Sequence, residues 1–387
     1  MDFEFAEDQR IFRDSVRRFA VEELASGALE RARTPGYPWD VARRMAAQGL
    51  LGITVKAADG GQDGTLMDAV LAIEQVALAC PRSSDVIQAG NFGPARTLAE
   101  YGSPAQKEKY LRPVLEGRGL ISIGMTEPDA GSALTDLKTR AEPDGNGYRV
   151  NGTKVFTTHS MDATAVLAYV RFGPGTAGIG SVLIEVEADG VSFGEPSKFM
   201  TGESWRQIYF DNVFVAPEDV LLKEGGFRKQ MAGFNAERIG NSARSLAFGR
   251  LAFDIAREHA GTRRAFDRPL CEFQGIQWKF AEMAMKLEAA QLMLYKAVVA
   301  AERGLPSAMD TSMAKHMCNQ HGFEVADEAL QVLGAMGFSE ETLVDYCMRR
   351  VRGMQIAGGS LEILKNRIAE GVFERRFPQR PPRPNTA

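Results

Sequence analysis

The chain has 387 residues, more than one small hydrophobic core can organise, so its length predicts two or three domains. An apolar content of 44% and a charged content of 25% are typical of a globular protein, and a net charge of −4 gives no reason to expect a nucleic-acid partner. With no apolar run near ~20 residues and no signal-peptide pattern, we expect a cytoplasmic protein without a membrane span.

Helical patterns dominate residues 1–120, which we predict to form an all-α N-terminal domain. A charged amphipathic helix is expected over residues 3–33, where apolar residues recur with the period of a helix. The same periodicity predicts four further helices, at about 39–49, 66–80, 84–101 and 104–117.

Short β-type runs separated by turn signals fill residues 121–224, which predicts a small middle β domain, either a barrel or a sandwich. The expected strands cover 121–125, 148–158, 163–172, 181–186 and 208–215. The segment Gly173–Gly178 matches the G-x-G-x-x-G of dinucleotide sites, but a β-rich run follows it where such a site needs a helix. We therefore interpret this segment as a hairpin loop.

Long helices return over residues 225–377 and predict a C-terminal four-helix bundle. Between Phe273 and Leu294, apolar residues are spaced alternately three and four apart, which is typical of a helix packed in a bundle. A proline-rich tail is expected over residues 378–387. The chain as a whole is predicted to be α+β, with helical, β and helical domains in that order.

Patterns for other chemistries are weak. His316 and His321 flank Cys318, but a spacing of five separates the two imidazoles around a helix, and no carboxylate pair completes a metal site. The four cysteines are scattered and suggest no disulfide framework. We expect no metal.

The most informative segments are two motifs in the predicted β domain. Gly124–Ser132 packs hydroxyls, glycine and proline into a turn whose backbone N–H groups can converge on an anion. Gly147–Thr158 reads as a hairpin that ends in the aromatic ring of Phe156 beside two hydroxyls. Together they suit a planar, hydrogen-bonding heterocycle that carries a diphosphate.

Five motifs in order across residues 1–377 resemble those of the acyl-CoA dehydrogenase family. They are T-E-P-x-A-G-S at Thr126–Ser132, aromatic-x-Thr at Phe156–Thr158, R-x-x-F…Q at Arg263–Gln274, Q-x-x-G-x-x-G-F at Gln331–Phe338, and G-S-x-E-I at Gly359–Ile363. The resemblance implies an acyl-CoA dehydrogenase-like fold, FAD as the cofactor and an acyl thioester as the substrate.

The resemblance also assigns roles to individual positions. It places Met125, Thr126, Phe156 and Thr158 around the flavin ring, with Thr158 donating a hydrogen bond near flavin N5, and it counts Gly131 and Ser132 among the cofactor contacts. It implies further FAD contacts at Arg263, Phe266, Gln274, Gln331, Gly334, Ser360 and Glu362, some of which family members supply from a neighbouring subunit. On the thioester side it implies Ser132, Asn235, Arg238, Gly358 and Gly359, where a backbone N–H of the glycine pair would polarise the thioester carbonyl.

The sequence departs from the commonest family pattern at the catalytic base. Many members carry a glutamate directly before the terminal G-[TS] pair, and that position is Gly358 here. Members similar to isovaleryl-CoA dehydrogenase place the base on an earlier helix, directly before an arginine, as in Glu237-Arg238. We therefore expect Glu237 to remove the α-proton while flavin N5 takes the β-hydride, which gives a 2,3-enoyl thioester.

Several alternatives stay open at this point. An enoyl-CoA reductase or a flavin monooxygenase would use the same fold, although the retention of Glu237 argues against a monooxygenase. The acyl carrier is either CoA or an acyl carrier protein, and a non-catalytic flavin-binding paralogue is a third hypothesis. The family further implies an electron-transferring flavoprotein as the electron acceptor and a homotetramer built as a dimer of dimers.

Overall fold

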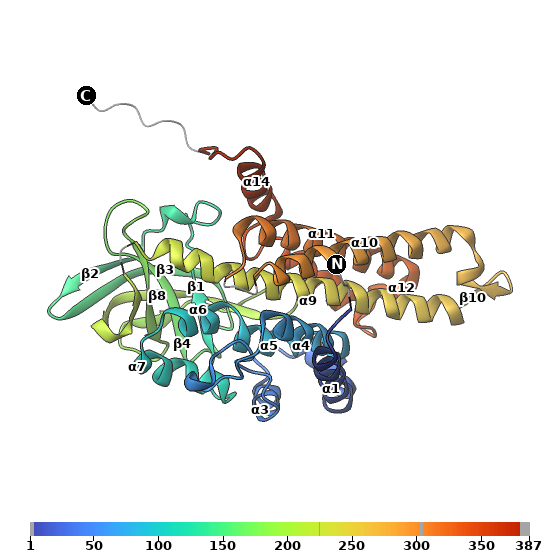
Figure 1. Cartoon of the computed structure of the whole chain (residues 1–387), viewed down its shortest axis with the longest axis horizontal. Coiled ribbons are helices and arrows are strands. Elements are labelled where there is room, and N and C mark those ends of the chain that lie inside the picture. The colour runs from blue at the N-terminus through green and yellow to red at the C-terminus, as the bar shows by residue number, and fades with distance from the viewer. Residues whose placement is uncertain (1–3, 224, 302–304, 380–387) are drawn as a thin grey trace.

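The computed structural model describes residues 4–223, 225–301 and 305–379, in which a sheet lies at one end of an elongated helical body (Figure 1). Glu224 at the expected domain boundary, and residues 380–387 of the expected tail, lie outside the described residues. None of the described helices is both long and apolar enough to cross a bilayer.

The N-terminal part contains short helices connected by turns. They are α1 (Glu7–Glu23), α2 (Ala28–Arg33), α3 (Trp39–Ala47), α4 (Leu66–Ala79), α5 (Ser84–Asn91), α6 (Gly93–Tyr101), α7 (Pro104–Gln106) and α8 (Arg112–Leu115), with a π-helical turn at Lys107–Leu111.

Two helices that the sequence predicts as continuous are broken in the structure. The one expected over 84–101 divides at Gly93, whose φ of +57° lies outside the right-handed helical region, so α5 ends and α6 begins there. The one expected over 3–33 gives way to a 3-10 turn at Ala25–Gly27, where glycine has a poor helix propensity.

The middle part forms a mixed sheet, which contains nine strands within the described residues. They are β1 (Ile121–Gly124), β2 (Arg140–Asp144), β3 (Gly147–Thr158), β4 (Ala165–Arg171), β5 (Ile179–Glu185), β6 (Val191–Phe193), β7 (Ser197–Lys198), β8 (Ser204–Val215) and β9 (Val220–Leu222). The order is β6-β8-β3-β2-β4-β5-β9, with β1 parallel to β4 and β7 beside β8. Strands β4 and β5 pair in antiparallel register from Ala165↔Glu185 to Arg171↔Ile179, so Gly173–Gly178 is indeed a hairpin loop.

The C-terminal part is built on one long helix, α9 (Phe227–Thr262), whose 36 residues extend about 54 Å at 1.5 Å per residue. Helix α9 packs with α10 (Gln274–Val299), α11 (Ala308–Leu333) and α13 (Val344–Met354). The predicted seam of α10 is confirmed in part, because Met283, Leu287, Ala290 and Leu294 are buried.

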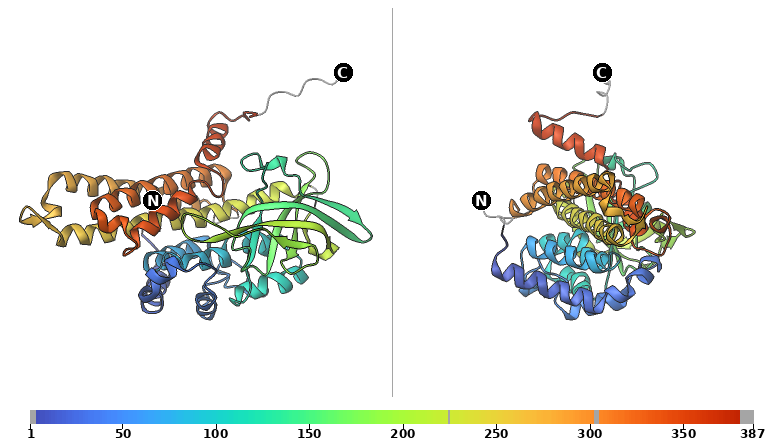
Figure 2. Two further views of the ribbon diagram at one scale, coloured as in Figure 1. Left: turned by 180° about the vertical axis from the view of Figure 1, so that it is seen from behind. Right: turned by 90° about the vertical axis from the view of Figure 1, so that its right-hand side faces the viewer.

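Smaller elements occupy the ends of this bundle. The ribbon of β10 (Arg264–Ala265) and β11 (Arg268–Pro269) lies at the tip farthest from the sheet, with α12 (Ala335–Phe338) after α11 (Figures 1 and 2). Helix α14 (Leu361–Val372) projects from the body, and only Leu364 of this helix is buried.

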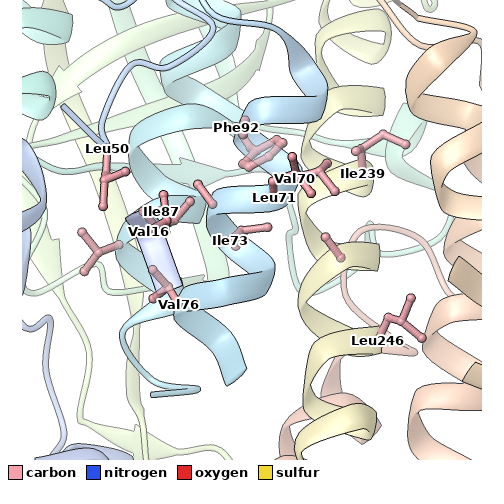
Figure 3. Packing of buried hydrophobic residues seen from close by; sticks show 14 of the residues in the cluster. Val16, Leu50, Val70, Leu71, Ile73, Val76, Ile87, Phe92, Ile239 and Leu246 are labelled. Atoms are coloured by element: carbon pink, nitrogen blue, oxygen red, sulfur yellow. The ribbon is translucent and has the colours of Figure 1, made fainter. Parts of the chain in front are cut away.

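The largest core joins the N-terminal helices to α9. Figure 3 shows Val70, Leu71 and Phe92 beside Ile239 of α9, all of them buried. A Cβ added to Gly240 would lie 2.8 Å from the Phe92 ring, so a glycine is needed where α5 approaches α9. This packing fixes the turn of α9 that carries Glu237.

Candidate active site

Glu237 lies on α9 where the junction of α5 and α6 crosses it. The side chain is half-buried, and a Cβ built on Gly93 would lie 2.5 Å from its Oε2 atom. Gly93 also has φ +57°, a conformation that favours glycine. The absence of a side chain at position 93 therefore makes room for the carboxylate.

The surroundings of Glu237 shift the pKa of its carboxyl group. Burial raises the pKa of Glu237 above its ordinary value, because the carboxylate loses hydration. Gln88 and the positive charges of Arg244 and Lys315 act in the opposite direction, whereas Asp85 raises the pKa further. Gln88 also donates from Nε2 to the backbone oxygen of Glu237 at 3.2 Å. A carboxyl group with a raised pKa is a stronger base once it is ionised.

Arg238 connects α9 to the glycine pair that precedes α14. Its Nε atom donates to the Gly358 oxygen at 2.9 Å, and its Nη1 atom donates to Asn235 Oδ1 at 3.0 Å. Asn235 in turn donates to the Pro306 oxygen at 3.0 Å. The structure therefore brings Asn235, Arg238 and Gly358 together in one hydrogen-bonded unit next to Glu237.

Lys315 of α11 supports the same turn from the other side. Its buried ammonium donates to the Met354 oxygen at 3.0 Å and to the Gly359 oxygen at 3.2 Å. Burial, together with the positive charge of Arg238, lowers the pKa of Lys315 to about 7, against the opposite effect of Glu237. Gly358 has φ +74°, and a Cβ there would lie 3.3 Å from Lys315 Cε, so a side chain at position 358 would be strained.

The residues expected around the flavin ring gather where β1 and β3 end. The Val155 N–H donates to the Thr126 oxygen at 2.9 Å, which places the turn after β1 against β3. Phe156 is 54% exposed at φ +56°, and its ring lies 4.5 Å from that of Trp205 between centroids. Thr158 is exposed opposite Trp205 in the β3–β8 pair.

An exposed aromatic ring in a left-handed turn, with a hydroxyl nearby, fits a planar aromatic cofactor. Met125 and Thr126 are half-buried beside it. Gly131 and Ser132 are exposed, and the space around Gly131 is open, with no atom within 4 Å of an added Cβ. The residues present are thus compatible with flavin at this end of the sheet.

A buried ion pair holds the turn after β1. Lys154 Nζ lies 2.8 Å from Glu127 Oε1, and both side chains are buried. Glu127 also accepts hydrogen bonds from the backbone N–H of Thr139 at 2.9 Å and of Lys138 at 2.5 Å. Burial lowers the pKa of Lys154 to about 8, against the opposite effect of Glu127.

The predicted FAD contacts at Arg263, Phe266 and Gln274 do not join this group within one chain. Arg263 and Phe266 lie at the β10–β11 ribbon, at the far tip of the bundle, with Gln274 at the start of α10 (Figure 1). Arg263 follows Glu237 by 26 positions, about 39 Å along the helix axis. Gln331 and Gly334 lie at the end of α11, whereas Ser360 and Glu362 begin α14 beside the glycine pair.

Sequence reasoning missed Gly93, Gln88, Lys315 and the Glu127–Lys154 pair. For Lys315 a signal existed, because it interrupts a stripe of buried small residues at Thr311, Ala314 and Cys318. Gly93 carried none, since its role depends on contact with a residue 144 positions later. In the part of the chain that the structure describes, no group of three or more metal-binding side chains is present.

Comparison with known proteins gives full-length matches. The domain families described as acyl-CoA dehydrogenase N-terminal, middle and C-terminal domains match residues 6–118, 122–213 and 224–373. A 3-sulfinopropanoyl-CoA desulfinase of Paraburkholderia xenovorans strain LB400 is 32% identical over 98% of this chain and 99% of its own.

Solved structures also match this chain over nearly its whole length. Butyryl-CoA dehydrogenase from Megasphaera elsdenii superposes with a TM-score of 0.90 at 30% identity, over 97% of this chain and 100% of its own. Glutaryl-coenzyme A dehydrogenase in its glutaryl-CoA complex gives a TM-score of 0.92 at 27% identity, over 97% and 98% of the two chains. The predicted fold class is thereby confirmed, and the chain belongs to the acyl-CoA dehydrogenase family.

Proposed function

We propose that Glu237 is the catalytic base of an FAD-dependent acyl-CoA dehydrogenase. The enzyme is an oxidoreductase of the CH–CH class, and its cofactor is FAD. The observation that carries the proposal is the contact between Gly93 and the half-buried Glu237 carboxylate, in surroundings that raise its pKa. Ionised Glu237 takes the α-proton of an acyl thioester, and the product is a 2,3-enoyl thioester.

Bound FAD supplies the acceptor for the hydride that leaves the β-carbon. Met125, Thr126, Phe156 and Thr158 are proposed to contact the flavin ring, and Gly131 and Ser132 are proposed as further cofactor contacts. Ser360 and Glu362 are proposed as additional FAD contacts at the start of α14.

The thioester is proposed to lie between α9 and the glycine turn. Asn235 and Arg238 would face its CoA side, with Ser132 near the pantetheine or phosphate part. A backbone N–H of Gly358 or Gly359 would donate to the thioester oxygen as enolate charge develops. The hydrogen bonds from Arg238 and Lys315 to this turn support its role, because they fix its position.

A second copy of the chain is part of the proposal. Arg263 lies about 39 Å from Glu237 along α9. We assign Arg263, Phe266, Gln274, Gln331 and Gly334 to the FAD of a neighbouring subunit. Exposed apolar side chains on the bundle support such an assembly. They are Trp278, Met285 and Leu292 of α10 and Phe338 of α12. The expected homotetramer, the electron-transferring flavoprotein as acceptor and a cytoplasmic location belong to this proposal as well.

The test is anaerobic flavin bleaching by acyl thioesters. Glu237→Gln is expected to retain bound FAD and to lose substrate-dependent bleaching. Glu74→Gln is a matched control, because Glu74 is another buried glutamate with a raised pKa, on α4. Bleaching of Glu237→Gln at the wild-type rate would contradict the assignment, and oxygen uptake with supplied reduced flavin would indicate a monooxygenase.

Membership of the family does not specify one acyl group as the substrate. The relatives are named for butyryl-CoA, glutaryl-CoA and 3-sulfinopropanoyl-CoA, which include both apolar and acidic acyl ends.

A further inference from the structure

A group of charged side chains from all three parts of the chain, four of them buried and two half-buried, meets beside Glu237. This group, the buried charge cluster, consists of Arg82, Asp85, His159, Glu203, Arg244 and Arg350. Asp85 comes from the start of α5 and Arg82 from the turn before it, His159 and Glu203 come from the sheet region, and the other two come from α9 and α13. His159 directly follows Thr158, and Arg244 and Asp85 act on the pKa of Glu237, so the cluster adjoins both the proposed flavin edge and the proposed base.

Asp85 is the centre of the cluster. Its Oδ1 atom lies 2.7 Å from Arg244 Nη1 and 2.9 Å from Arg350 Nη2, and its Oδ2 atom lies 2.6 Å from Arg82 Nη1. Glu203 pairs with Arg82 and, at 2.6 Å, with Arg350. Both Asp85 and Arg244 influence the pKa of Glu237, which places them in its immediate electrostatic surroundings.

The formal charges of the cluster do not balance. Three arginines face two carboxylates, and His159 adds a further positive charge whenever it is protonated. Asp162 lies 3.6 Å from Nδ1 of His159 and offsets that charge, so the imbalance concerns the three arginines. The carboxylate near the third arginine, Arg244, is Glu237, and its charge disappears when it takes the α-proton. A buried arginine left without a counter-charge is costly.

Hydrogen-bond donors are also left over. Arg244 Nε and the Tyr346 hydroxyl are buried and have no hydrogen-bond partner within the described residues. Buried polar atoms in native proteins are almost always partnered. A cluster that served only to join the three parts of the chain would be expected to match its charges and satisfy its donors. The surplus charge and the free donors both indicate a missing acceptor with a negative charge.

Resting on the proposed function, we infer that the acyl group of the substrate ends in an anionic group, a carboxylate or similar oxyacid, which Arg244 of the cluster binds. Arg244 is the arginine on the same helix as Glu237, seven residues later and therefore two turns along nearly the same face. A substrate anion there supplies both the acceptor and the charge that the cluster lacks. An apolar acyl end would instead leave Arg244 Nε without an acceptor.

The test compares glutaryl-CoA with pentanoyl-CoA, which have acyl chains of equal length and differ at the terminal group. Anaerobic titration of the FAD-loaded enzyme yields a dissociation constant from the shift in flavin absorbance and a rate constant from bleaching. Wild type is expected to bind glutaryl-CoA roughly tenfold more tightly or better, as for a charge-assisted hydrogen bond. Arg244→Gln is expected to lose this preference while its affinity for pentanoyl-CoA stays within about twofold.

Two further variants make the test specific. Arg244→Lys keeps the positive charge and should retain part of the preference for glutaryl-CoA. If Arg244→Gln does not hold FAD, the comparison of wild type with Arg244→Lys still tests the inference. Arg250→Gln makes the same chemical change on the same helix, next to Glu74 instead of the cluster, and should leave the preference unchanged.

The outcomes distinguish the proposed recognition of an anionic acyl end from the proposed dehydrogenase function. Equal or tighter binding of pentanoyl-CoA by wild type overturns the inference, as does an equal loss of affinity for both thioesters in Arg244→Gln. Preferential binding of glutaryl-CoA without bleaching by any thioester supports the recognition site and contradicts the dehydrogenase function. Bleaching that is faster with pentanoyl-CoA supports the dehydrogenase function and contradicts the recognition site.

Discussion

The α-carbon of Gly93 lies against the carboxylate of Glu237, so close that a Cβ at position 93 would approach Oε2 to 2.5 Å. The N-terminal helices thus shape the position of a side chain that belongs to the C-terminal bundle. Any residue larger than glycine must displace the carboxylate or the α5–α6 junction.

Gly93→Ala is therefore expected to reduce the rate of flavin bleaching by at least about tenfold, because small displacements of a catalytic group are costly. Gly145→Ala is the matched control, since Gly145 has nearly the same φ, +58°, with no atom within 4 Å of an added Cβ. Both variants should lose about 1 kcal/mol of stability from backbone strain, and only the first should lose activity. Equal activities in the two variants would refute the positioning role.

Lys315→Met should lower turnover without removing FAD. The change removes the donor from two backbone oxygens, those of Met354 and Gly359, at a cost of about 1–3 kcal/mol for buried acceptors. The glycine turn then loses its fixed position against Arg238. Lys296→Met, at an exposed ion pair on α10, is the control and should behave as wild type. The measurement is the bleaching rate per bound FAD. An unchanged rate in Lys315→Met would argue against a role of the glycine turn in turnover.

Lys154→Met should release FAD and lower the melting temperature. It leaves Glu127 buried without its cation, a change that costs about 3–5 kcal/mol. Removing both charges in Lys154→Met/Glu127→Gln should recover part of the stability, because no unpaired charge remains. The FAD absorbance per chain and the thermal unfolding curve check the two effects. A double variant less stable than Lys154→Met would show that the unpaired charge of Glu127 does not cause the destabilisation.

Stability should fall with rising pH because of Glu74. Burial raises the pKa of Glu74 from 4.5 to about 7, while hydrogen bonds from Gln291 and Tyr295 partly oppose the shift. Between these two values the folded state holds a proton that the unfolded chain releases, so the stabilisation present below pH 4.5 is lost as pH rises through 7. The loss is about 3 kcal/mol at most. Glu74→Gln should flatten urea-unfolding stability across this window, and an unaltered pH profile in that variant would contradict the assignment.

Phe266→Ser should affect cofactor retention and leave the fold of the chain intact. The side chain is 90% exposed, so it contributes little to the core of its own chain. If it contacts the FAD of a neighbouring copy, the variant should lose flavin on dilution at protein concentrations where wild type keeps it. Identical flavin content at every concentration would argue against the shared site.

Local motifs predicted much of the sheet and the bundle from sequence. Strands such as β4 were recognisable because every residue from Ala165 to Val170 is apolar or aromatic and buried. The break at Gly93 was missed because a glycine in an otherwise helical pattern has no unique local meaning. The domain boundaries and the roles of individual site residues stay predictions.

The buried charge cluster was invisible in the sequence for a different reason. Asp85 and Arg350 are 265 positions apart, and each alone is typical of a solvated helix surface. Only the packing of three distant segments desolvates them together. Long-range electrostatics of this kind has no short-range signature.

Helix α9 also sets the angle around its axis between Glu237 and the β10–β11 ribbon. Because each residue of an α-helix turns the chain by about 100°, one residue inserted between Glu237 and Arg263 would swing the β10–β11 ribbon by about 100° around the axis. Seven inserted residues would nearly restore the angle while adding about 10 Å of length. The residue count of this helix is therefore as constrained as the identity of its side chains.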